Sequence, residues 1–183
     1  MKRLLSKLIF KLNGWKIIGI KTYPIKCLVL SAPHTSNWDF MLGRCYAYII
    51  GVQPKYLIKS ELFLLGLATL IKWNGGVPVY RNSKNNVVDQ AVEMFKNSSQ
   101  LNLGIAPEGT RTKVEKWKTG FYHIAVKANV PILLLKMDYK KKEIGIMCKF
   151  YASGNFVKDM LFIQEKYTNI KGKTPEYFNP KIY

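Results

Sequence analysis

Short apolar runs alternate with stretches of helical spacing along most of the chain, and this alternation constrains the fold more than any other feature of the sequence. Strands that alternate with helices build a mostly parallel sheet with helices on its faces. We therefore expect a single α/β domain with a mixed, largely parallel sheet flanked by helices. The pattern predicts strands at 27–32, 55–58, 77–80, 101–106, 131–137 and 143–151, the last antiparallel to the one before it, and helices at 38–50, 61–73, 87–95 and 121–129. Pro78 cannot donate to a sheet, so its strand belongs at an edge or its start.

In such folds the functional groups gather beyond the carboxyl ends of the strands, and the strand at 27–32 is followed by His34-Thr-Ser-Asn-Trp-Asp39. The chain has only two histidines and eleven acidic residues, so a histidine and an aspartate five positions apart at a strand end are not expected by chance. His34 and Asp39 are therefore a candidate site. A histidine held by a carboxylate can take a proton from a hydroxyl near neutral pH.

The spacing of this motif has a geometric consequence. Five residues along one continuous helix would turn the two side chains about 140° apart. His34 and Asp39 can meet only if the histidine lies in the turn and the aspartate folds back from the first turn of the helix, which Ser36 or Asn37 is suited to cap. The alternative is that Asp39 merely caps the helix and that His34 is an ordinary turn residue.

A second strand end carries groups suited to phosphate. The run from Gly104 to Arg111 ends in Glu108-Gly109-Thr110-Arg111, where the glycine permits a tight turn and the arginine offers a planar fork of donors. Glu108 would brace the turn or the arginine. The alternative is a plain turn with a solvated arginine. A third run, 75–81, again ends a strand in an arginine, Arg81, and three such strand ends favour one shared site.

The charge of the chain points to an anionic partner. Twenty-nine lysines and arginines against eleven acidic residues give a net charge of +18, which suits nucleic acid or an anionic lipid surface. Three cysteines without Cys-x-x-Cys spacing favour a reducing compartment and argue against a zinc site or a disulfide framework.

The first residues have the pattern of an amphipathic helix. One face carries Leu4, Leu5, Leu8, Ile9 and Leu12, and lysines and an arginine occupy the other. This pattern suits a helix that lies in the interface of an anionic bilayer, and the alternative is a terminal helix packed on the domain. Lysines interrupt the apolar stretch and no cleavage site follows, so we expect no signal peptide. No window approaches the roughly 18 apolar residues that would span a bilayer.

Taken together, these blocks resemble those of the 1-acyl-glycerol-3-phosphate acyltransferases, the glycerolipid acyltransferase family. Four family blocks occur in order, namely His34 to Asp39, Gly75 to Arg81, Glu108 to Arg111 and Val130-Pro131-Ile132. The resemblance extends from about residue 25 to residue 137. It implies the glycerolipid acyltransferase fold. Together with the amphipathic pattern of the first residues, it divides the chain into a membrane-interface helix at 1–15 and an acyltransferase domain at 16–183.

The resemblance implies a reaction and a location. His34 would be the general base on the hydroxyl of a lyso-lipid acceptor, and Asp39 would orient it. The activated oxygen would attack an acyl thioester, either acyl-CoA or acyl carrier protein, with no bound cofactor and no metal. Phosphatidic acid would be the product, formed at an anionic membrane surface on the cytoplasmic side of the cell membrane by a peripheral or monotopic enzyme.

The resemblance also implies further site residues. Pro131 belongs to the block that supports the acyl pocket in this family. The fourth block continues as Leu133-Leu134 without the second proline of many members, and Pro33 precedes the histidine where others have asparagine, so acceptor and chain length stay open. The acceptor phosphate would be bound by Arg81, Glu108, Gly109, Thr110 and Arg111.

Two alternatives to this function stay open. The acceptor could be another hydroxyl lipid, such as a lysophospholipid or an N-acyl amino acid lipid. A basic nucleic-acid-binding domain would account for the charge, but no recognised motif for one is present, and it leaves the His-Asp and Glu-Gly-Thr-Arg blocks unexplained. We therefore expect no nucleic-acid partner.

Overall fold

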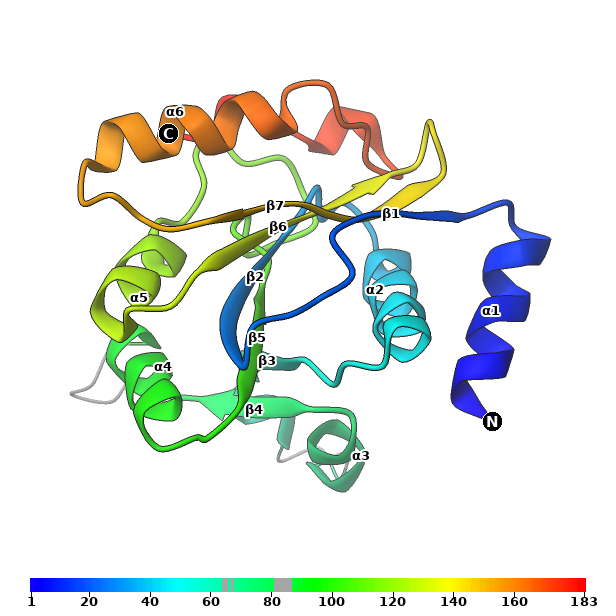
Figure 1. Cartoon of the computed structure of the whole chain (residues 1–183), viewed down its shortest axis with the longest axis horizontal. Helices are drawn as coiled ribbons and strands as arrows, with labels where there is room; N and C mark the ends of the chain where they lie inside the picture. Colours follow the sequence, from blue (N-terminus) through cyan, green and yellow to red (C-terminus); the bar gives the residue numbers. More distant parts are fainter. Residues whose placement is uncertain (64–65, 67, 81–86) are drawn as a thin grey trace.

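A computed structural model of the chain describes residues 1–63, 66, 68–80 and 87–183. Over these residues, a seven-stranded sheet has the order β1-β7-β6-β2-β5-β3-β4 (Figure 1). Five strands, β2 to β6, run parallel, whereas β7 is antiparallel to β6 and parallel to β1. The strands are β1 (Lys16–Gly19), β2 (Lys26–Ala32), β3 (Lys55–Lys59), β4 (Gly76–Val79), β5 (Leu101–Ile105), β6 (Ile132–Asp138) and β7 (Glu143–Phe150).

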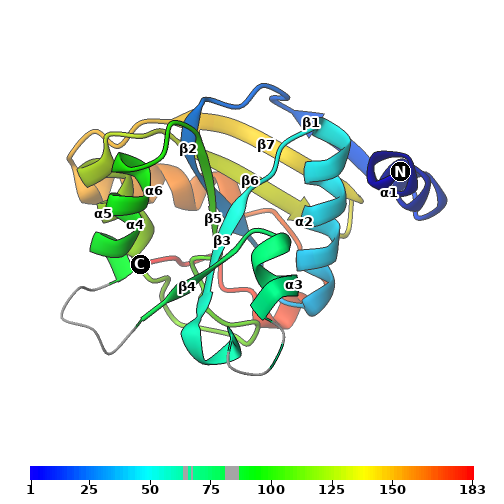
Figure 2. The same cartoon turned by 90° about the horizontal axis from the view of Figure 1, so that it is seen from below.

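Helices cover both faces of this sheet, so the fold has three layers (Figure 2). Helices α4, α5 and α6 lie on one face, and α1 and α2 lie on the other. The α-helices are α1 (Lys2–Leu12), α2 (Asn37–Ile50), α3 (Ala68–Trp73), α4 (Val87–Lys96), α5 (Gly120–Ala128) and α6 (Phe156–Tyr167), and two short 3-10 helices span Ser60–Phe63 and Pro175–Tyr177.

The core is divided by the alternation of side chains along the central strands. On β2, Leu28 and Leu30 pack against α4, α5 and α6, whereas Cys27 and Val29 pack on the side of α1 and α2. All four are buried, because successive side chains of a strand point to opposite faces and both faces are covered here. Continuous apolar runs such as 27–30 are therefore what a central parallel strand of this fold needs.

The fold class and most predicted elements are confirmed. The β6–β7 pair is antiparallel as expected, and β4, which contains Pro78, lies at the edge of the sheet. The single helix predicted at 61–73 is wrong. A 3-10 turn over Ser60–Phe63 and the shorter α3 take its place, and Gly66 between them has a φ of +72°, which no continuous right-handed helix allows.

Strand β1, helix α6 and the short 3-10 helix Pro175–Tyr177 were not predicted. Strand β1 is only four residues long and pairs with β7, far away in sequence. Helix α6 does carry a signal, because its buried residues Met160, Ile163 and Tyr167 recur at helical spacing. Within the described residues, no helix is both long and apolar enough to cross a membrane.

Candidate active site

The His-Asp motif begins just beyond the carboxyl end of β2, and its two side chains meet. Nδ1 of His34 lies 3.3 Å from Oδ2 of Asp39. The contact forms because α2 starts between them. Ser36 is the N-cap residue, its side chain accepts from the Trp38 N–H, and Asp39 reaches back to the backbone of the cap. The folded-back geometry expected from the spacing is thus the one observed. With Nδ1 turned to the carboxylate, Nε2 is the ring nitrogen left to act as a base.

Asp39 is a buried carboxylate, with its side chain fully inaccessible to solvent. Oδ2 accepts from the backbone N–H groups of Thr35 at 2.7 Å and Ser36 at 2.8 Å. Oδ1 accepts from the hydroxyl of Tyr139 at 2.6 Å. Burial acts to raise the pKa of this carboxyl, but these bonds and the His34 ring outweigh it and leave the pKa below its usual value. The carboxylate is therefore ionised and ready to hold the imidazole.

Glu108, which follows β5, approaches the same histidine from the neighbouring strand. Its Oε1 accepts from the backbone N–H of His34 at 2.9 Å. The residue is buried, with 3% of its surface exposed, and Oε2 has no hydrogen-bond partner. Burial raises the pKa of Glu108, and the bond from His34 offsets part of that rise. Glu108 thus ties the turn after β5 to the turn after β2, which are adjacent because β2 and β5 pair in parallel.

The rest of this turn is exposed. Gly109 has a φ of +67°, a backbone conformation that favours glycine. A Cβ at this position would meet only the flexible end of the Lys118 side chain, with Nζ at 3.0 Å. Thr110 and Arg111 are exposed beside it, and the two hydroxyls of Thr110 and Thr112 are 3.2 Å apart. A flexible cation and an exposed turn of this kind can receive an anion from solvent, and phosphate binding by these residues stays a prediction.

Of the other sequence-predicted residues, one is not described by the structure and one lies at the opposite end of the sheet. Arg81 lies outside the described residues. Pro131 is buried before the start of β6, where its carbonyl accepts from the N–H of Leu28. Pro131 therefore lies at the amino end of the parallel β2–β6 pair, whereas His34 follows the carboxyl end of β2, at the opposite end of the strand. Its role in an acyl pocket stays a prediction.

The carboxy-terminal segment after α6 completes the site, and sequence reasoning missed it. The N–H of Thr174 donates to Oγ1 of Thr35 at 3.2 Å, and a Cβ on Gly172 would lie 2.6 Å from the same oxygen. The N–H of Tyr139 donates to the carbonyl of Lys171 at 2.9 Å. No local pattern marks these residues, since each contact depends on where a distant segment ends.

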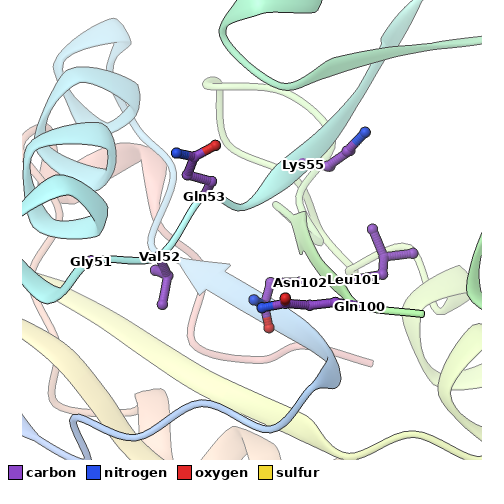
Figure 3. Close-up of a pocket in the computed structure, with 7 residues that line it drawn as sticks. All are labelled: Gly51, Val52, Gln53, Lys55, Gln100, Leu101 and Asn102. Carbon is purple, nitrogen blue, oxygen red and sulfur yellow. The ribbon is translucent and has the colours of Figure 1, made fainter. Parts of the chain in front are cut away.

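A cleft of about 370 Å³ lies elsewhere, at the amino ends of β3 and β5 (Figure 3). Lys55 begins β3 and Leu101 begins β5, and Gln53, Gln100 and Asn102 are also at this end. In parallel sheets of this kind the reacting groups lie at the carboxyl ends, so this cleft is separate from the His34 site. The described residues include no group of three or more His, Cys, Asp or Glu side chains that could hold a metal ion.

Comparison with known proteins identifies both a family and a fold. A family model described as Acyltransferase matches residues 17–136, which includes both motifs. The structure is similar to the crystal structure of the 1-acyl-sn-glycerophosphate (LPA) acyltransferase PlsC from Thermotoga maritima, with a TM-score of 0.62 and 19% identity. The match covers 90% of this chain and 74% of that chain, and at this identity it shows the fold alone. No curated protein matches the sequence.

Proposed function

The chain belongs to the acyltransferase family, and from this premise we propose that it transfers a fatty acyl chain from an acyl thioester to a lyso-glycerolipid hydroxyl. The proposed acceptor is 1-acylglycerol-3-phosphate, and the product is phosphatidic acid. One observation carries the proposal. The His34–Asp39 pair and the exposed turn Gly109 to Arg111 both lie at the carboxyl ends of the parallel strands, and Glu108 joins the two. A base and an anion-binding turn side by side suit a hydroxyl substrate that carries a phosphate.

The acyl group passes directly from the thioester to the acceptor hydroxyl, by addition and then elimination. Nε2 of His34 takes the proton of the acceptor hydroxyl as its oxygen attacks the thioester carbonyl. Asp39 holds Nδ1–H and stabilises the imidazolium that forms. The tetrahedral intermediate then collapses, the carbon–sulfur bond breaks, and the thiolate receives the proton from the imidazolium. The products are an ester and a free thiol, so atoms and charge balance without an acyl-enzyme.

The acceptor phosphate binds at the exposed turn. Arg111 offers two parallel N–H donors to the phosphate, and Gly109 and Thr110 let the backbone and a hydroxyl approach it. Glu108 is buried and supports this turn from below. Its part in phosphate binding is proposed to be indirect, because a carboxylate in contact with a phosphate would repel it. Arg81, which follows β4 in the sequence and lies outside the described residues, is proposed as a second cationic contact.

Acyl transfer itself is the test. The purified protein is incubated with a radiolabelled long-chain acyl thioester, offered in parallel on coenzyme A and on acyl carrier protein. The acceptors are 1-acylglycerol-3-phosphate, a lysophospholipid with a larger headgroup and an N-acyl amino acid lipid. We expect labelled phosphatidic acid, and none with His34→Ala. If label appears only in one of the other two lipids, that lipid is the acceptor in place of 1-acylglycerol-3-phosphate. If no combination of donor and acceptor gives transfer, the proposed function is wrong.

We also propose that α1 contacts an anionic membrane surface. Its apolar residues face solvent, with Leu4 72% exposed and Leu12 75% exposed, while Phe10 on the opposite side packs with residues of α2. Burying a leucine side chain in an apolar phase contributes about 1.5–3 kcal/mol when burial is complete. Each basic residue near an anionic surface adds about 1 kcal/mol, and the net charge of +18 has the matching sign. The enzyme would thus sit on the cytoplasmic face of the cell membrane as a peripheral or monotopic protein.

Co-sedimentation with anionic vesicles tests this contact. Replacing Leu5, Leu8 and Leu12 with serine should release the protein into the supernatant. The matched control replaces Val157 and Leu161 with serine, since both are about half exposed on α6, across the sheet. Added salt should weaken binding of the unmodified protein without abolishing it, because salt screens the charges and leaves the apolar contact. Unmodified protein that stays in solution at low salt would rule the contact out.

A further inference from the structure

A tyrosine far from both motifs touches the proposed catalytic pair. Tyr139 is the first residue of the turn that joins β6 to β7, 100 positions after Asp39. Its hydroxyl donates to Oδ1 of Asp39 at 2.6 Å, a distance typical of a charge-assisted bond from a hydroxyl to a carboxylate. Residue 139 lies beyond the segment 17–136 that the family model matches, so the family match assigns it no role.

The two oxygens of Asp39 are divided between different partners. Oδ2 faces the turn after β2, where it accepts from the N–H groups of Thr35 and Ser36. The same oxygen lies 3.3 Å from Nδ1 of His34. Oδ1 accepts from Tyr139. Rotation of the carboxylate about its Cβ–Cγ bond would change the direction in which Oδ2 points. The two backbone N–H groups resist this rotation at Oδ2, and the phenol of Tyr139 resists it at Oδ1.

We propose that Tyr139 is a positioning residue for the His34–Asp39 pair: its hydroxyl fixes the Asp39 carboxylate so that Oδ2 stays aligned with Nδ1 of the histidine. Tyr139 would not touch the substrate and would act only through Asp39. This assignment rests on the proposed function for its kinetic consequence, whereas the alignment of the histidine ring can be measured without any substrate.

Tyr139 is itself held from two sides. Its ring meets the edge of Trp15 at right angles, with the ring centroids 5.0 Å apart. Its backbone N–H donates to the carbonyl of Lys171 in the carboxy-terminal segment. Trp15 also packs near Phe10 of α1, with centroids 6.4 Å apart. A side chain constrained in this way loses little further freedom when it donates to Asp39, which suits a positioning role.

The same hydrogen bond has an electrostatic effect. The titratable groups that act on Asp39 are His34, Tyr139 and Glu108, from three different turns. Burial acts to raise the pKa of Asp39, and the Tyr139 hydroxyl is one of the contacts that lower it. Removing this donor raises the pKa of Asp39 and makes its carboxylate a stronger acceptor, so the hydrogen-bonded His34–Asp39 pair takes up the proton that disables the base at higher pH. The acid limb of the pH–rate profile should then move to higher pH.

Tyr139→Phe is the test, because it removes the hydroxyl and keeps the ring against Trp15. The control is Tyr23→Phe, which removes another partly buried hydroxyl that packs with the same core cluster and contacts Tyr46 instead of the pair. Transfer activity in Tyr139→Phe should fall by about 10-fold to 100-fold in kcat, the range expected for a lost hydrogen bond to a charged group, with KM for both substrates unchanged. The acid limb should shift to higher pH only in this variant.

Nitrogen NMR of the histidines provides a readout that needs no substrate. The chain has two histidines, so His34→Ala assigns the signals of His34 directly. We expect the Nδ1–H tautomer of this ring in the unmodified protein and in Tyr23→Phe, and a mixture of tautomers in Tyr139→Phe. Unchanged His34 signals together with an unchanged pH profile would overturn the positioning role. If no acceptor is ever acylated, the NMR result still decides the proposal, and failure of the proposed function is recognised separately.

Discussion

Asp39→Asn should destabilise the protein, and the structure gives the size of the effect. The carboxylate is buried and accepts three hydrogen bonds, from Thr35, Ser36 and Tyr139. An asparagine can keep its oxygen toward the two backbone N–H groups and turn its amide toward the tyrosine, whose hydroxyl can accept instead of donating. The variant should therefore fold with the same contacts, each of them now neutral.

The change in free energy of unfolding follows from those contacts. A hydrogen bond to a charged group contributes about 1.5–3 kcal/mol and a neutral one about 0.5–1.5 kcal/mol, so three weakened bonds cost about 3 kcal/mol. Relief of the desolvation of a buried charge offsets part of this loss. Although burial acts to raise it, the pKa of Asp39 lies below its usual value, which means that the native state favours the ionised form. The net loss should thus be between about 1 and 3 kcal/mol at pH 7.

The pH dependence gives this prediction its sign. Because the pKa of Asp39 is lower in the folded than in the unfolded chain, its stabilisation is fully present above the unfolded value of about 3.9 and is lost as the pH falls through the folded value. Asparagine does not titrate, so the deficit of the variant should shrink below about pH 4.

Urea unfolding followed by tryptophan fluorescence, at pH 7, 5 and 3.5, measures this difference. Glu176→Gln, at an exposed position, is the control that should show no such deficit. Equal m-values are needed for the comparison. An asparagine variant as stable as the unmodified protein at pH 7, or a deficit that is the same at pH 3.5, would refute the reasoning.

Three further predictions concern the site. His34→Ala should abolish acyl transfer while the free energy of unfolding and vesicle binding stay unchanged. A variant that kept a sizeable part of the rate would disprove the base assignment. Asp39→Asn should lose less activity than His34→Ala if the carboxylate only orients the ring. Arg111→Ala should raise the KM for a phosphorylated acceptor by roughly 10-fold or more and leave the KM for the acyl donor unchanged, since a charge-assisted bond to phosphate is made in ground and transition state alike. Steady-state kinetics with each substrate varied in turn measures both constants. A loss confined to kcat would show that the arginine does not bind the phosphate. Gly172→Ala should cost about 1–3 kcal/mol in urea unfolding and lower the transfer rate, because a Cβ there would lie 2.6 Å from Oγ1 of Thr35. Gly43→Ala, where a Cβ meets nothing within 4 Å, is its control, and equal stability of the two variants would contradict the packing argument.

The sequence by itself determined the fold class and the contact between His34 and Asp39. Alternating strand and helix patterns suffice for an α/β sheet, because each pattern reflects which faces of its own element are buried. The contact between His34 and Asp39 was predictable for a similar reason. Both residues belong to one strand-turn-helix segment, and Ser36 caps the helix within it, so local backbone geometry brings the two side chains together.

Only the tertiary structure decided what surrounds that pair. Glu108 reaches the backbone of His34 because β5 lies next to β2, and Tyr139 reaches Asp39 because the β6–β7 turn ends above the start of α2. Gly172 packs on Thr35 because the segment after α6 returns across the sheet edge. No periodicity or capping pattern carries this information, since strand order and register depend on the sum of many distant packing contacts, whereas a motif records only the conformation of its own few residues.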